Sequence, residues 1–107
     1  MGKRRFTIAD LERRVKVRAK ASAKNSYTRQ LIDRGVSQCA KKFGEEAVEA
    51  ALAAVGESRK RLTAETADMF YHLLVMLKAR GVTLRDVEAE LAKRQAKSGL
   101  AEKASRR

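Results

Sequence analysis

The chain has 107 residues, of which 44% are hydrophobic and 36% charged, and it contains no proline. This size fits one domain over residues 1–107, and we expect its basic ends, at about 1–5 and 98–107, to be flexible. Lys and Arg outnumber Asp and Glu by 25 to 13, and the resulting net charge of +12 favours a polyanionic partner. No apolar stretch approaches the roughly 20 residues of a transmembrane helix, so no membrane partner is predicted.

The composition also indicates the fold class. Residues that favour helices dominate, and apolar positions recur with helical spacing, which predicts an all-α bundle of about four to five helices. The single cysteine, Cys39, excludes an intramolecular disulfide and is typical of the reducing cytoplasm. A chain this short buries a limited core, so we expect association with a second copy to complete it.

Two short helices are predicted first in chain order. Thr7 and Asp10 resemble a capping box, which would start a helix that runs to about Lys20 and carries a basic outer face. Ser26 is expected to cap the next helix, and Gly35 to end it in the left-handed conformation.

Two longer helices follow, over about 37–55 and 58–80. The connection between them is short, which predicts antiparallel packing. Gly44 interrupts the first of them at a cost of about 1 kcal/mol relative to alanine, so we expect it to allow close approach of another backbone or a ligand. Gly81 should end the second.

A last helix is predicted after Gly81. Thr83 and Asp86 form another capping-box pattern, and the apolar spacing continues to about Lys97.

Five carboxylates gather in the two longer helices. Glu45, Glu46 and Glu49 share one stripe of the first, and Glu65 and Asp68 share one stripe of the second. Like charges at these spacings cost roughly 0.2 to 0.5 kcal/mol per pair on an isolated helix. Oxygen ligands on facing helices suit Mg²⁺ or Mn²⁺, so we interpret the group as a metal site. A solvated surface stripe is the alternative.

His72 lies on the same stripe as Glu65 and Asp68. Two interpretations stay open for it: a ligand or proton shuttle, or an interior histidine held by hydrogen bonds.

Four stretches of the chain resemble one family. They are KKFGEEAVEA at 41–50, ETADMFYHLLVMLKARG at 65–81, SYTRQLIDRG at 26–35 and SGLAEKASR at 98–106. They are similar to segments of the phosphoribosyl-ATP pyrophosphohydrolases, which act in the second step of histidine biosynthesis and belong to the wider MazG-like superfamily. The acidic pairs by themselves indicate only that superfamily, and the segments at 26–35 and 98–106 narrow the match.

The resemblance implies a cytoplasmic, homodimeric enzyme of the acid anhydride hydrolase class. It would hydrolyse phosphoribosyl-ATP to phosphoribosyl-AMP and pyrophosphate with Mg²⁺, or Mn²⁺, as cofactor. Glu46, Glu49, Glu65 and Asp68 would be the metal ligands, and Glu45, Glu46 and Glu49 the catalytic residues, with Glu45 assisting the metal or activating water.

Basic and polar residues are the candidates for substrate binding. Those expected to hold phosphate oxygens are Arg29, Lys41, Lys42, Lys103 and Arg106. Tyr27 and Thr28 are candidates for contacts with base or ribose, with helix capping and packing as the alternative.

Two other functions fit part of this pattern. One is a MazG-type pyrophosphohydrolase of noncanonical nucleotides. The other is a basic helical module that binds nucleic acid, with affinity that falls steeply with salt and needs no Mg²⁺. Against that module stand the few aromatic residues, two Tyr and three Phe, and the acidic centre of the chain.

Overall fold

The computed structural model describes residues 4–95 and 103, and these contain α-helices and no strand. The helices are α1 (Ile8–Ala19), α2 (Tyr27–Asp33), α3 (Val36–Gly56), α4 (Arg59–Arg80) and α5 (Leu84–Arg94). The predicted all-α class is therefore confirmed. The expected flexibility of 1–3, 98–102 and 104–107 concerns residues outside this description.

Side-chain caps fix where four of these helices begin. Thr7 and Thr83 each form a complete capping box, with Asp10 and Asp86 as the partners three residues on. Ser26 and Ser58 accept hydrogen bonds from backbone N–H groups in the first turns of α2 and α4.

Two glycines have positive φ angles at helix ends. Gly81 ends α4 in the left-handed conformation, as predicted. Gly35 follows α2, but its φ of 96° and ψ of 168° lie outside the left-handed helical region, so the predicted conformation is wrong. Its backbone is extended with a positive φ, a region that glycine occupies almost exclusively, and it also serves as the N-cap of α3.

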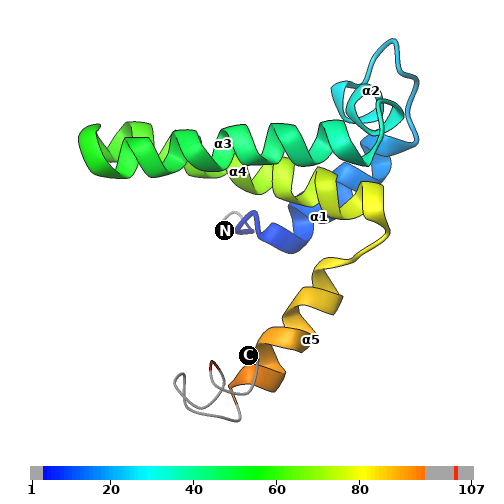
Figure 1. Cartoon of the computed structure of the whole chain (residues 1–107). Coiled ribbons are helices and arrows are strands. Elements are labelled where there is room, and N and C mark those ends of the chain that lie inside the picture. The colour runs from blue at the N-terminus through cyan, green and yellow to red at the C-terminus, as the bar shows by residue number, and fades with distance from the viewer. Residues whose placement is uncertain (1–3, 96–102, 104–107) are drawn as a thin grey trace.

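α3 and α4 are the longest helices and run antiparallel, and α1 and α2 pack at the end where α3 begins and α4 finishes (Figure 1). The core lies at that end and comprises Val15, Leu31, Cys39, Leu74 and Val75. Cys39 is buried and donates a hydrogen bond to the Leu31 carbonyl oxygen at 3.3 Å. Two short helices therefore cover one end of a two-helix scaffold.

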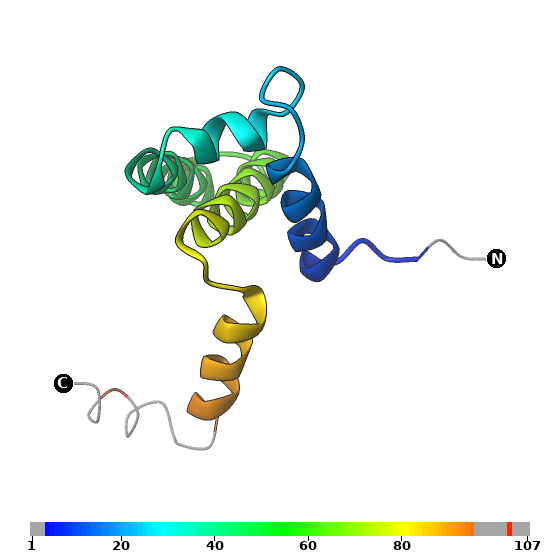
Figure 2. The same cartoon turned by 90° about the vertical axis from the view of Figure 1, so that its right-hand side faces the viewer.

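α5 stands away from the other helices, as the two views show (Figures 1 and 2). None of its residues is buried. Its first turn is joined to α1, because the Leu84 N–H donates to Glu12 Oε2 at 2.7 Å. The helix ends at Arg94, and Lys97, its predicted limit, lies outside the described residues.

Gly44 is exposed in α3, and no atom lies within 4 Å of the position that a Cβ would take, helix backbone nearby aside. The expected close approach of another backbone is therefore wrong for the described part of this chain. Over the same residues, no helix is long and apolar enough to cross a membrane.

Candidate active site

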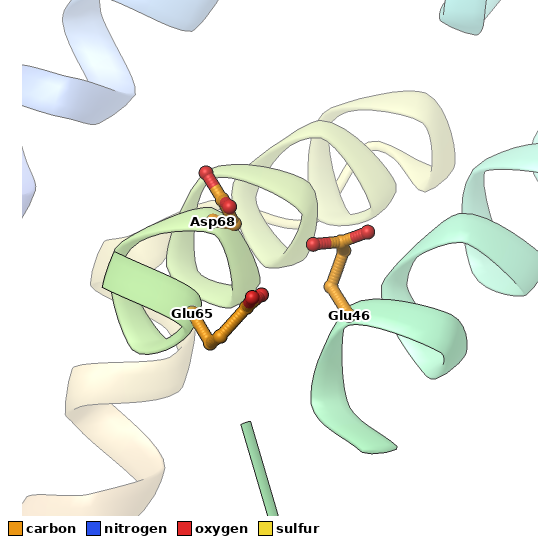
Figure 3. Close-up of side chains that lie close together, drawn as sticks. All are labelled: Glu46, Glu65 and Asp68. Atoms are coloured by element: carbon orange, nitrogen blue, oxygen red, sulfur yellow. The ribbon is translucent and has the colours of Figure 1, made fainter. Parts of the chain in front are cut away.

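Glu46 of α3 and Glu65 and Asp68 of α4 form a three-carboxylate cluster. One carboxylate oxygen from each lies within 4.8 Å of the other two. Figure 3 shows Glu46 and Glu65 extending into the space between the helices, with Asp68 beside Glu65 on α4. Glu65 is buried, Glu46 half-buried and Asp68 exposed, so the cluster opens to solvent on one side. Packing of α3 against α4 thus joins residues that are about twenty positions apart in the sequence.

Two basic side chains partly neutralise the cluster. Lys42 Nζ lies 3.8 Å from a carboxylate oxygen of Glu45 and 3.8 Å from one of Glu46. Arg61 donates to Glu65 at 2.6 Å and to Glu57 at 3.2 Å. Hydrogen bonding to Glu57 and the charges of Glu65 and Glu57 raise the pKa of Arg61. Arg61 was not among the predicted site residues, although its i,i+4 spacing to Glu57 and Glu65 was a usable signal.

The cluster fits a small divalent cation. Its ligand set is oxygen only, which Mg²⁺ and Mn²⁺ prefer. At Mg–O distances of 2.0–2.1 Å, opposite ligands are about 4 Å apart, close to the upper separation found here. Modest side-chain rotation would therefore bring all three oxygens into coordination range.

Glu45 and Glu49, the other predicted acids of α3, are exposed and lie outside this group. Glu45 faces Lys42. The charge of Glu49 makes a small contribution to the raised pKa of Arg61. Three of the four predicted metal ligands are thus together, and Glu49 is next to them along the helix.

The predicted phosphate-binding cations occupy different environments. Arg29 pairs with Asp33 at 2.9 Å and donates to the Ala21 carbonyl oxygen at 3.1 Å, so it braces α2. Lys41 and Lys103 are exposed. Lys42, described above, is the one among these described cations that an ion pair places at the cluster. Arg106 lies outside the described residues.

Tyr27 and Thr28 also differ from each other. Thr28 is buried, and its hydroxyl lies 2.5 Å from that of Tyr71, which favours the packing role over a substrate contact. Tyr27 is half exposed, and its ring meets His72 edge-on. No local sequence pattern indicates the role of Tyr71, because its partner Thr28 is 43 positions away.

An all-helical bundle that places three carboxylates between two antiparallel helices offers a set of oxygen ligands that suits a divalent cation. The family model for phosphoribosyl-ATP pyrophosphohydrolase matches residues 8–95, and the chain belongs to this family. The predicted resemblance is therefore confirmed.

Individual relatives agree with this membership. The chain is 58% identical over 106 residues to a phosphoribosyl-ATP pyrophosphatase of Azorhizobium caulinodans, covering 99% of this chain and 97% of the relative. It is 58% identical over 103 residues to phosphoribosyl-ATP pyrophosphatase 1 of Bradyrhizobium diazoefficiens, covering 96% and 97%. A phosphoribosyl-ATP pyrophosphatase of Rhizobium meliloti is 52% identical over 101 residues, covering 94% of both chains.

Proposed function

We propose that this protein hydrolyses phosphoribosyl-ATP to phosphoribosyl-AMP and pyrophosphate, in histidine biosynthesis, with a divalent cation at Glu46, Glu65 and Asp68. The family membership supports the substrate and the reaction. The observation that supports the cation is the convergence of three carboxylate oxygens within 4.8 Å at the junction of α3 and α4.

The carboxylates of the cluster are proposed to hold Mg²⁺, or Mn²⁺ in its place. When bound, the cation would neutralise phosphate charge, polarise the reacting phosphorus and lower the pKa of water. Glu49 is proposed as a further ligand, because it follows Glu46 on the same stripe of α3.

The chain's own residues would handle substrate and water. Lys42, which already lies beside Glu45 and Glu46, is proposed to bind a phosphate oxygen. Glu45 is exposed at the rim of the cluster, where its carboxylate would orient or deprotonate the attacking water. The water oxygen bonds to phosphorus as the bond between the α and β phosphates breaks, and pyrophosphate leaves.

We also propose that the protein acts as a homodimer in the cytoplasm. α3 exposes Val48, Leu52 and Val55, which are 59%, 61% and 88% exposed and share one face at i, i+4 and i+7. α5 has 11 residues and none of them buried, and a helix this short is marginal in water without packing. The exposed apolar face of α3 and the unpacked α5 favour a second copy as the partner.

A single assay tests the reaction. Purified protein is incubated with phosphoribosyl-ATP, with Mg²⁺ or with EDTA, and both products are quantified. We expect pyrophosphate and phosphoribosyl-AMP in equal amounts and only with the cation. Release of orthophosphate, or equal rates in EDTA, would reject the proposal, and faster turnover of noncanonical nucleoside triphosphates would favour the MazG-type alternative.

The dimer has its own test. Light scattering coupled to gel filtration should give twice the chain mass of 11.9 kDa, and Leu52→Glu should give the chain mass. A wild-type monomer at micromolar concentration would reject the dimer.

A further inference from the structure

His72 lies near the carboxylate cluster, and two aromatic rings surround it. It is 7% exposed and sits on α4 one turn beyond Asp68, on the stripe that carries Glu65. Its ring meets Tyr71 edge-on at a centroid distance of 4.9 Å and Tyr27 at 6.3 Å. The Tyr71 hydroxyl is in turn fixed by Thr28 of α2. The imidazole is thus held in one orientation by groups from two helices.

The nitrogens of this ring have no hydrogen-bond partner among the described residues. In the same part of the chain, no fully buried side-chain nitrogen or oxygen lacks a partner. The nitrogens of His72 therefore reach the surface while the remainder of the ring is covered. Because the ring nitrogens reach the surface and no protein group binds them, they can form a hydrogen bond with a ligand.

Electrostatics indicate where the ring lies relative to the cluster. Burial lowers the pKa of His72, and the surrounding charges are those of Glu46, Lys42, Asp68 and Glu45. Its nitrogens are nevertheless not members of the group of ligand atoms that lie within 4.8 Å of one another. The ring is therefore near the carboxylate cluster but is not one of its members.

The hydrogen-bond donors and acceptors around the cluster indicate which ligand would bind. The carboxylates of the cluster are acceptors, so a phosphate beside them needs donors from elsewhere. Neutral imidazole supplies one N–H donor, and Lys42, whose charge acts on the ring, supplies an ammonium group. We propose that the His72 N–H binds a phosphate oxygen of the nucleotide substrate, beside Lys42, and that Tyr71 and Tyr27 orient the ring for this contact. This inference rests on the proposed function.

Steady-state kinetics on matched variants test the contact. His72→Phe keeps an edge-on ring but removes the N–H, whereas His72→Asn and His72→Gln place an amide N–H near the two ring nitrogens. A hydrogen bond to a charged group corresponds to roughly tenfold to a hundredfold in binding, so His72→Phe should raise KM by that factor with kcat little changed. One of the two amide variants should restore KM substantially.

Met76→Ala is the matched control, because Met76 is one turn further along α4 and packs against the core without a polar contact. It should lower the melting temperature and leave KM unchanged. If His72→Phe leaves KM unchanged in an enzyme whose wild type releases pyrophosphate, the inference is overturned and the proposed function stands. If the wild type releases none, the proposed function itself fails.

A spectroscopic readout does not depend on turnover or on folding of a variant. The chain has one histidine, so ¹⁵N-histidine labelling gives ring resonances that belong to His72. With Mg²⁺ present, adding pyrophosphate or phosphoribosyl-AMP should shift one ring nitrogen beyond the effect of Mg²⁺ itself. The inference is overturned if neither product shifts it, or if Mg²⁺ produces the whole change.

Discussion

Two acidic sites in this chain differ in how completely neighbouring groups neutralise their carboxylates. Asp10 accepts hydrogen bonds from Arg4 at 2.6 Å, from Arg13, and from the Thr7 backbone N–H and hydroxyl, both at 2.9 Å. The hydrogen bond from Arg4, followed by that from the Thr7 backbone, holds the pKa of Asp10 far below its ordinary value.

In the cluster of Glu46, Glu65 and Asp68, by contrast, carboxylates face one another and two cations serve them. The chain neutralises Asp10 by itself, whereas the cluster keeps an excess of negative charge. The negative charge of Asp10 therefore contributes to the stability of the fold, whereas the negative charge of the cluster is available for a bound cation.

The largest expected effect is on the cluster. Asp68→Asn removes one charged ligand and should lower kcat by more than about a hundredfold, since loss of groups that only support ligands already costs 10- to 100-fold. The helical circular-dichroism spectrum should be unchanged, because Asp68 is exposed. Asp10→Asn is the matched control and should keep kcat in a folded protein.

Glu49 gives a second test of the cation site, because its carboxylate lies outside the cluster in this structure. If it completes the cation site by side-chain rotation, Glu49→Gln should lower kcat to a similar extent and raise the Mg²⁺ concentration needed for half-maximal rate. A wild-type rate and Mg²⁺ dependence would remove Glu49 from the site.

Substitution of Asp10 is expected to change the stability of the protein and not its activity. Its folded pKa lies below the ordinary 3.8, so its contribution to stability is fully present above that value and is lost as the pH falls through the folded pKa. Asp10→Asn should therefore lower the melting temperature at about pH 7, and the difference from wild type should narrow toward about pH 2. A difference that does not depend on pH would contradict this account.

Gly44 gives the smallest expected effect. With open space around it, Gly44→Ala should raise the free energy of unfolding by about 1 kcal/mol, measured by urea denaturation. If activity falls although stability rises, a substrate or a second chain approaches α3 at this position. Unchanged activity would leave the glycine without a role in the reaction.

Much of the fold follows from local sequence signals. Thr7, Ser26, Ser58 and Thr83 mark helix starts through bonds to residues three positions away, so their roles could be predicted. The link between Glu12 and Leu84 spans 72 positions, and no local pattern encodes it. The direction in which α5 extends from the other helices was likewise not predictable from the sequence.

The candidate site also combines features that the sequence predicts with features that depend on tertiary packing. Spacing on two antiparallel helices predicted that Glu46, Glu65 and Asp68 meet, because helical periodicity fixes which residues share a stripe. It did not separate Glu49 from Glu46, since this depends on how α3 is rotated against α4. The environment of His72 depends on Tyr27 and Tyr71 together, and therefore on tertiary packing.

The cation site is the central claim, and Mn²⁺ binding tests it most directly, because free Mn²⁺ gives an electron paramagnetic resonance signal that is lost on binding. Titration of wild type, Asp68→Asn and Asp10→Asn with Mn²⁺ measures the affinity of the cluster. We predict saturable binding by wild type and Asp10→Asn, competition by Mg²⁺, and binding by Asp68→Asn that is weaker by at least tenfold. Equal affinity of all three proteins for Mn²⁺ would contradict the assignment of the cluster.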